Sequence, residues 1–344
     1  MTKTEIAAKI KNMISENLRI PENMLDDDAE LFGGDIGLDS VDSLEIISGI
    51  DDLFGVDMTG VDREHFQTIN ALASYVEEHV EQQRERRCVI TGLGLICAAG
   101  NDVDTCWQNI CAGKTGIDEV KSVSTEGCVS HVGAEVHCED LPAPEYDRSV
   151  RLCLHAAHEA VRDGRLTDSA VREAGVILGS CVGGAASIDH YYTGLLQGRT
   201  EEQDVLKMSA SAIAANTAFA LGANGETANI VNACAAGTMS ISYACDLIRL
   251  GRGEIFLAGG TDAFSSLAYA GFNALHALSA GPCSPLNHSN GISLGEGAGV
   301  LVVEEYEHAI RRGAKIYCEV AGWGVSSDAF HITAPQPQGE GQMA

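Results

Sequence analysis

The sequence predicts a multidomain protein in which an all-α bundle precedes a larger α/β domain. Three observations lead to this fold class. The chain has 344 residues, 45% of them hydrophobic, which is enough for two or three cores. Acidic residues are concentrated at the front, where residues 1–87 hold 20 Asp and Glu against 8 Lys and Arg. Apolar residues recur there at helical spacing, whereas strand and helix patterns alternate beyond residue 87.

The front segment contains apolar repeats of helical period that are separated by polar loops. Pro21 closes the first repeat and Gly55 closes the second, because neither residue type continues a helix well. Asp39 and Ser40 precede the second repeat, and both residue types are preferred at helix N-termini. We therefore expect a small four-helix bundle, with helical pieces at 6–18, 41–54, 62–66 and 69–80.

Beyond residue 87, short apolar runs alternate with helical repeats, as in α/β domains. Gly92 and Gly94 suggest a dinucleotide-binding loop, but Cys97 occupies the position of its third glycine. No acidic residue follows a second strand at the required distance, so NAD binding is rejected. The pattern predicts strands at 88–95, 176–178, 254–260, 299–304 and 315–325, and helices at 103–112, 150–162 and 209–221.

The stretch 229–238 predicts a strand, a tight turn and a helix, with Cys234 on the turn. Ile230 and Val231 lead into small residues, and a helical repeat follows until Gly251. A thiol at the N-terminal end of a helix lies near unpaired N–H groups and the positive end of the helix dipole, which favour the nucleophilic thiolate. Spacing alone supports a buried structural cysteine equally well.

Composition excludes several classes of partner. The formal net charge of −27 argues against nucleic acid and anionic membranes. No apolar run approaches the length of a membrane span, and the first residues lack an apolar signal segment. Twelve cysteines are scattered without Cys-x-x-Cys spacing, which predicts free thiols rather than disulfides or a metal site. We therefore expect a cytoplasmic protein without a bound metal ion.

Cys234 lies in Asn-Ala-Cys-Ala-Ala-Gly at 232–237, which resembles the nucleophile motif of the beta-ketoacyl-acyl carrier protein synthases, the ketosynthases of fatty-acid and polyketide synthesis. Three further stretches resemble the family in the same order, at 87–94, 112–117 and 284–299. The resemblance implies a thiolase-like fold with a complete N-terminal half and an incomplete C-terminal half. It also implies that Cys234 is the catalytic residue and that the synthase domain forms a homodimer.

The front segment resembles acyl carrier proteins through Gly-Leu-Asp-Ser at 37–40 and the acidic helix that follows. In that family the serine after the aspartate carries 4′-phosphopantetheine, so the resemblance assigns Ser40. Ser43 falls one turn further into the helix and is not assigned. A phosphopantetheinyl transferase is then an expected partner, and the acidic helix is expected to dock partner enzymes. The implied domains are a carrier domain at 1–82, a short linker at 83–87 and a synthase domain at 88–344.

The resemblance implies a two-stage reaction. Cys234 first takes an acyl group from a thioester of carrier protein. Malonyl carrier protein then loses carbon dioxide, and the resulting enolate attacks the acyl group in a decarboxylative Claisen condensation. Two histidines and a lysine from the family's second half assist this stage, and their motifs would follow residue 344. We therefore expect a C-terminally truncated or split synthase that does not complete turnover alone. His331 and Thr333 are assigned to the substrate pocket.

Other functions stay open beside the synthase. The chain would be an acyl-carrier shuttle if its condensing domain served only for docking. A thiolase acting on coenzyme A esters fits less well, because it leaves the fused carrier segment unexplained. A chain-length factor also fits less well, because those proteins lack the cysteine. The sequence also leaves open whether Ser40 serves Cys234 of its own chain or of another.

Overall fold

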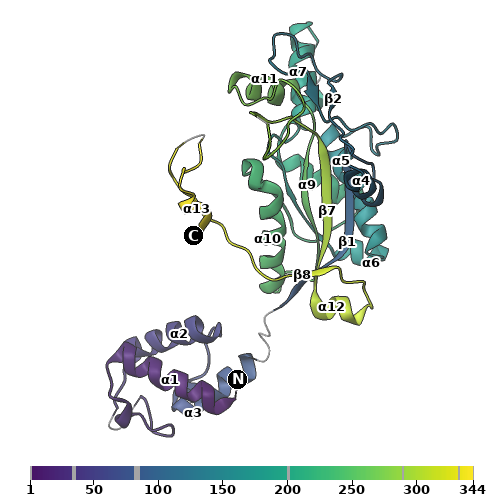
Figure 1. Cartoon of the computed structure of the whole chain (residues 1–344). Coiled ribbons are helices and arrows are strands. Elements are labelled where there is room, and N and C mark those ends of the chain that lie inside the picture. Colours follow the sequence, from purple (N-terminus) through teal and green to yellow (C-terminus); the bar gives the residue numbers. More distant parts are fainter. Residues whose placement is uncertain are drawn as a thin grey trace. The chain divides into compact units, whose positions relative to one another are not determined.

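The computed structural model describes residues 2–32, 36–80, 86–199, 202–288, 290–331 and 334–343. The chain folds into two compact units, residues 1–86 and 87–344, each with a hydrophobic core of its own (Figure 1).

The first unit is a helical bundle, as the sequence predicts. Its core consists mainly of isoleucine and leucine side chains from all three α-helices, such as Ile10, Ile50 and Leu72. The piece predicted at 62–66 is a short 3-10 helix, which contributes buried Phe66 to this core. The elements are α1 (Lys3–Leu18), η1 (Glu22–Met24), α2 (Ser40–Phe54), η2 (Arg63–Phe66) and α3 (Ile69–Val80).

The second unit is built on a six-stranded sheet with the order β5-β4-β6-β7-β1-β8. β4 pairs in parallel with β5 and with β6, whereas β7 runs antiparallel to both β6 and β1. β1, β4, β5 and β6 therefore point the same way. The strands of this sheet are β1 (Cys88–Cys97), β4 (Gly175–Gly179), β5 (Thr227–Ile230), β6 (Ile255–Asp262), β7 (Gly297–Glu305) and β8 (Cys318–Val320).

Every strand predicted in the second unit is present, but the last one is shorter than the predicted 315–325. β8 pairs only with the first three residues of β1, at an edge of the sheet. A separate two-stranded ribbon joins β2 (Asp118–Glu119) to β3 (Val132–Gly133).

Helices cover both faces of the sheet, so the unit has three layers (Figure 1). α5 (Arg148–Asp163) and α9 (Ser211–Leu221) pack on one face, and α10 (Ala236–Arg249) packs on the other. Four of the remaining helices have only four or six residues, too few to display a helical period in the sequence. The remaining helices are α4 (Val103–Cys111), α6 (Asp168–Glu173), α7 (Ala185–Leu196), α8 (Glu202–Val205), α11 (Ser266–Ala274), α12 (Tyr306–Arg311) and α13 (Glu340–Met343).

Gly92 and Gly94 of β1 have a packing role. A Cβ at Gly94 would lie 1.8 Å from the carbonyl oxygen of Ala156, and one at Gly92 would lie 2.4 Å from that of Ala160. Both carbonyls belong to α5, so a side chain at either glycine would push the helix off the sheet. The two glycines therefore let α5 contact β1 directly.

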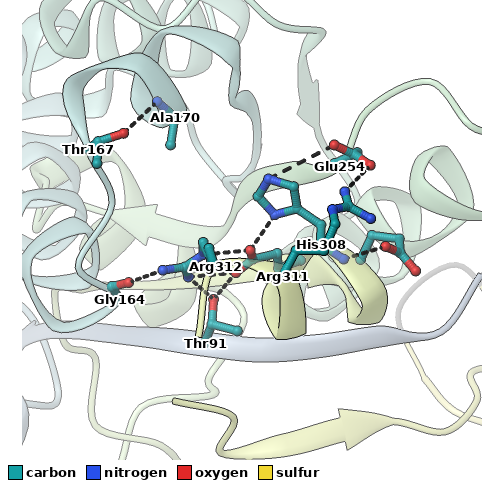
Figure 2. A network of polar contacts seen from close by, with 10 residues as sticks. Thr91, Gly164, Thr167, Ala170, Glu254, His308, Arg311 and Arg312 are labelled. Carbon is teal, nitrogen blue, oxygen red and sulfur yellow. Dashed lines mark hydrogen bonds and ion pairs between the residues drawn. The ribbon is translucent and has the colours of Figure 1, made fainter. Parts of the chain in front are cut away.

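A network of charges around the buried Glu304 anchors α12 to the sheet at the end opposite the carboxyl end of β1 (Figure 2). The side chain of Glu304 is fully buried near the end of β7. Its carboxylate accepts hydrogen bonds from Thr91 Oγ1 at 2.7 Å, from His308 Nδ1 at 2.5 Å and from Arg312 at 2.6 and 2.7 Å. Arg312 also donates to the carbonyl oxygen of Gly164 at 2.8 Å, so the network joins α12, β1, β7 and the end of α5.

The pKa of Glu304 lies below its ordinary value of 4.5. Burial alone raises this pKa, but the hydrogen bonds from Arg312, Thr91 and His308 outweigh burial because they stabilise the charged form. A carboxylate whose pKa is lowered on folding stabilises the protein above its unfolded pKa. That stabilisation is lost as the pH falls through the folded pKa.

We expect Glu304→Gln to lower the free energy of unfolding at neutral pH by about 3 kcal/mol, the lower end of the range for breaking a buried ion pair, because it leaves the half-buried Arg312 without a charge partner. The difference between the wild type and the variant should shrink as the pH falls from 4.5 towards the lowered pKa of folded Glu304, because the unfolded wild type then binds a proton that the folded wild type does not yet hold. Urea unfolding of both proteins across this pH range measures the difference.

Glu307→Gln is the matched control, because Glu307 lies on the same helix with an exposed side chain. Its effect should stay within about 0.5 kcal/mol at every pH. If the loss of unfolding free energy in Glu304→Gln did not change with pH, the expected coupling between protonation of Glu304 and stability would be contradicted.

Candidate active site

The carboxyl ends of four strands meet at one edge of the sheet, because β1, β4, β5 and β6 run in the same direction. A pocket of about 560 Å³ opens there, next to the first turn of α10. Its walls are mainly apolar. The side chains that line it include Leu95, Cys97, Ser180, Cys181, Val182, Cys234, Asp262, Phe264, Phe272 and Leu294.

Cys234 lies on the predicted turn between a strand and a helix. β5 ends at Ile230, a short 3-10 turn covers Ala233–Ala235, and α10 begins at Ala236. Ala233 has a φ of +42°, a left-handed conformation that costs a residue with a Cβ on the order of 1–3 kcal/mol. This sharp turn leaves Cys234 exposed in the pocket wall, at the end of a helix whose first N–H groups have no partner within the helix.

Close packing under the turn holds it against the sheet. A Cβ at Gly179 would lie 2.3 Å from the carbonyl carbon of Ala236, so only glycine lets α10 begin this near to β4. Ser240 of α10 donates its hydroxyl to the carbonyl oxygens of Gly237 at 2.7 Å and Gly259 at 2.5 Å. The backbone that carries Cys234 is therefore fixed to both β4 and β6.

Asp262, at the end of β6, organises the neighbouring wall of the pocket. Its carboxylate accepts hydrogen bonds from the Ser180 hydroxyl at 2.7 Å, from the Cys181 N–H at 3.0 Å and from the Val182 N–H at 3.2 Å. One carboxylate thus holds three consecutive residues that follow β4. The thiol of Cys181 and the apolar side chain of Val182 line the pocket that contains Cys234.

Cys181 is a second exposed thiol in this pocket. Partial burial raises its pKa, and the neighbouring Asp262 carboxylate and Cys234 sulfur raise it further. Cys181 is therefore expected to remain a protonated thiol at neutral pH, which makes it a weak nucleophile.

We expect Asp262→Asn to slow the alkylation of Cys234 by an electrophile with a long alkyl tail by about tenfold, because a lost hydrogen bond to a charged group costs about 1.5–3 kcal/mol. The amide keeps one acceptor oxygen, but it presents N–H₂ to the Cys181 N–H, the one donor that the second carboxylate oxygen also accepts. Alkylation by iodoacetamide should change less than about twofold, since this small reagent needs no ordered wall. Time-resolved intact mass spectrometry measures both rates.

Asp147→Asn is the matched control. Asp147 accepts hydrogen bonds from the N–H groups of Ser149 and Ser187 and from the Ser187 hydroxyl, at 2.7–2.8 Å, but it does not line the pocket. The Asp147→Asn variant should be less stable, but both reagents should alkylate its Cys234 at the wild-type rate. Equal slowing by both aspartate variants would mean that Asp262 acts through stability alone.

Of the other two predicted pocket residues, the structure describes only His331, and it does not bring His331 to the Cys234 pocket. His331 is exposed in the segment that follows β8, and it is not among the described residues that line the pocket. This segment leaves the sheet after β8 (Figure 1). Thr333 lies outside the described residues.

Ser40 is the first residue of α2 and is exposed. Asp39 caps the helix instead: its side chain accepts the N–H groups of Val41 at 2.7 Å and Asp42 at 3.1 Å. The Ser40 hydroxyl is therefore not needed for capping. Ser43 is half-buried, and its hydroxyl donates to the carbonyl oxygen of Ser40 at 2.7 Å.

A groove of about 610 Å³ opens beside Ser40, between α2 and the segment that leads to α3. Apolar side chains line part of it, among them Leu38, Ile47 and Met58. An exposed hydroxyl at a helix N-terminus beside such a groove fits the attachment of a long phosphodiester-linked arm, because helix N-termini favour phosphate.

Within the described ranges, no cluster of three or more His, Cys, Asp or Glu side chains has the arrangement needed to hold a metal ion. No helix among the described residues combines the length and apolarity needed to cross a membrane.

Sequence reasoning missed three pocket residues, Cys97, Cys181 and Asp262. Cys97 and Asp262 are the last residues of β1 and β6, and Cys181 is the second residue after β4. The sequence could have indicated these residues through their positions at the ends of predicted parallel strands, because such positions meet at one edge of a sheet.

Comparisons with known proteins agree on both units. Residues 85–309 match the family model "Beta-ketoacyl synthase, N-terminal domain", and residues 8–76 match "Phosphopantetheine attachment site". The chain is 36% identical over 277 residues to the 3-oxoacyl-[acyl-carrier-protein] synthase 2 of Staphylococcus aureus (strain N315). That match covers 75% of this chain and 67% of the relative.

Two solved structures resemble the second unit closely. The ishigamide ketosynthase/chain length factor aligns with a TM-score of 0.70 at 33% identity, covering 74% of this chain and 67% of that one. A type II polyketide synthase acyl-carrier protein in complex with its ketosynthase bound to the hexaketide aligns with a TM-score of 0.65 at 31% identity, covering 72% and 65%.

Proposed function

This chain belongs to the beta-ketoacyl synthase family and carries a phosphopantetheine attachment domain ahead of the synthase domain, and from this we propose that Cys234 is the acyl-accepting nucleophile of a condensing acyltransferase. The observation that carries the proposal is the exposed Cys234 thiol, held on a strained turn at the start of α10 inside a largely apolar pocket. Apolar walls suit an acyl chain, and a thiol suits thioester exchange.

The first half-reaction follows from these residues. The Cys234 sulfur attacks the carbonyl carbon of an acyl thioester, and the carbonyl oxygen takes on negative charge. We propose that a backbone N–H group at the turn, that of Cys234, stabilises this oxyanion. When the carbonyl re-forms, the bond to the donor sulfur breaks, and the proton from Cys234 passes to the departing thiol. The acyl group is then a thioester of Cys234.

The carrier unit holds 4′-phosphopantetheine on a serine, and we propose that this serine is Ser40. When attached, the arm supplies a terminal thiol that carries acyl groups as thioesters. Ser40 is exposed, and Asp39 takes over the capping of α2, which leaves the Ser40 hydroxyl for modification. A phosphopantetheinyl transferase is the partner that this modification requires.

The acidic helix α2 is proposed to dock partner enzymes. Val41 and Leu44 are 69% and 65% exposed on it, beside exposed Glu45, Asp51 and Asp52. An apolar contact framed by carboxylates suits a basic, partly apolar partner surface. Carrier protein and acyl thioesters are the partners that the family itself supports.

We propose that two synthase units pair along β5. This strand lies at an edge of the sheet, where it offers N–H and C=O groups to another strand. Val231 directly after it and Phe219 on the adjoining α9 are 58% and 79% exposed. Sedimentation that found only monomer at micromolar concentration would contradict this interface.

We propose that the chain consists of a carrier domain at 1–82, a linker at 83–87 and a synthase domain at 88–344. The assignment of His331 and Thr333 to the substrate pocket stays a proposal that rests on the family resemblance, because His331 does not line the Cys234 pocket in the structure. The twelve thiols suit a reducing compartment, so a cytoplasmic location is proposed, with no nucleic-acid or membrane partner for a chain of net charge −27. Cell fractionation tests the location.

Intact mass spectrometry tests the proposed function. The chain is first incubated with coenzyme A and a phosphopantetheinyl transferase, and then with an acyl thioester. We expect one phosphopantetheine mass followed by one acyl mass, which peptide mapping places on Cys234. A chain that gained the arm but never acylated Cys234 would instead be an acyl-carrier shuttle.

A further inference from the structure

The thiols of Cys97 and Cys106 lie next to each other at the pocket that contains Cys234. Neither cysteine takes part in the acyl transfer proposed for Cys234. Cys97 is the last residue of β1, and Cys106 is the fourth residue of α4. Their sulfur atoms lie 3.4 Å apart, and both cysteines are free thiols.

The backbone between them holds this distance. Cys97 and Gly100 exchange two hydrogen bonds, of 2.9 and 3.0 Å, which fold the chain back on itself. A Cβ at Gly100 would lie 2.5 Å from the N atom of Cys106, so only glycine lets α4 begin this near to the end of β1. Asp102 and Glu159 accept N–H groups from the first turn of α4 at 2.8 and 3.0 Å.

The two thiols differ in access. Cys97 is half-buried and lines the pocket, whereas Cys106 is only 2% exposed. Burial raises the pKa of Cys106 to about 11, and the contact with Cys97 contributes to the shift. A dissolved reagent therefore meets Cys97 first, and Cys106 lies behind it within reach of the same sulfur.

We propose that Cys97 and Cys106 are a reversible dithiol–disulfide pair in the wall of the Cys234 pocket, which closes when the protein meets a low-molecular-weight disulfide such as oxidised glutathione. The Cys97 thiolate attacks one sulfur of the reagent, forms a mixed disulfide and releases one thiolate. Cys106 then loses its proton and attacks the Cys97 sulfur, which releases the second thiol. The two protein thiols are oxidised, the reagent is reduced to two thiols, and the sulfur atoms approach from 3.4 Å to about 2.0 Å.

Two other thiol pairs are the competitors. Cys88 and Cys245 interact through their side chains, but both are completely buried, so a dissolved disulfide cannot reach them. Cys181 and Cys234 both face the pocket and are both exposed. A disulfide at either pair instead of Cys97–Cys106 would refute the proposal.

The test uses the full chain with oxidised glutathione as the probe, followed by alkylation with iodoacetamide and mass spectrometry. When the chain is unfolded in denaturant for the alkylation step, we expect the loss of two of the twelve alkylatable thiols, a cross-linked peptide that joins Cys97 to Cys106, and full recovery after a thiol reductant. A glutathione adduct that persisted on Cys97, or no reaction at Cys97, would overturn the inference.

Variants assign the two roles. In Cys106→Ser the glutathione adduct on Cys97 should accumulate, because no second thiol displaces it, and in Cys97→Ser both the adduct and the cross-link should be lost. Cys111→Ser is the matched control, since Cys111 lies on the same helix with an exposed thiol, and it should keep the cross-link. An unchanged cross-link yield in Cys106→Ser would assign the bond to another pair. None of these measurements depends on acyl transfer, so their outcome is independent of the proposed function.

Discussion

Replacing Cys234 with alanine is expected to abolish the acyl adduct on the synthase unit. Without the sulfur, no covalent intermediate forms, and acyl transfer should fall by at least about 10⁴-fold, since losing a covalent nucleophile costs on the order of 10⁶ in a well-studied hydrolase. The measurement is intact mass after exposure to an acyl thioester, followed by peptide mapping. Thermal unfolding should change little, because Cys234 is exposed and fills no core.

Cys181→Ser is the control for this experiment. Cys181 lines the same pocket, but partial burial and the neighbouring Asp262 carboxylate and Cys234 sulfur raise its pKa, so its thiol should contribute little as a nucleophile. The variant should keep at least about half of the wild-type acylation rate, because the serine hydroxyl is nearly isosteric. Acyl groups found on Cys181 in the Cys234→Ala protein would show that the pocket, rather than one turn, selects the nucleophile.

Ser40→Ala is expected to abolish attachment of the phosphopantetheine arm completely. The alanine variant should still fold, because the side chain of Asp39, and not that of Ser40, accepts the N–H groups of the first turn of α2. The measurement is the mass gained with coenzyme A and a phosphopantetheinyl transferase, with circular dichroism to show that the bundle is intact.

Ser43→Ala separates the two candidate serines. Ser43 is half-buried and gives its hydroxyl to the carbonyl oxygen of Ser40, so it presents less of its side chain to a modifying enzyme. This variant should gain the full mass and lose at most about 1 kcal/mol of stability, the typical net value of one hydrogen bond. Mass gained by Ser40→Ala but not by Ser43→Ala would reverse the assignment.

Local patterns predicted much of this fold. The bundle, the strands and the helices α4, α5, α9 and α10 of the second unit lie where the apolar periods place them, because each element is stabilised along one continuous face, whereas the twelve-residue α7 was not predicted. The strand, turn and helix around Cys234 are confirmed for the same reason, since β-branched residues, small residues and a helical repeat follow one another within one segment. The shortest helices, such as α8 and α12, escaped prediction because they span little more than one turn.

The sequence by itself determined the fold class and the two residues around which the proposals are built, Ser40 and Cys234, since each stands in a short local motif. The tertiary structure alone decided what surrounds them. Asp262 and the pocket thiols meet Cys234 only because β1, β4, β5 and β6 are parallel, and strand order leaves no trace in local periodicity. Glu304 and Thr91 are likewise brought together from 213 positions apart by the pairing of β7 with β1. Such contacts depend on the free energy of the whole packed sheet, which no single segment encodes.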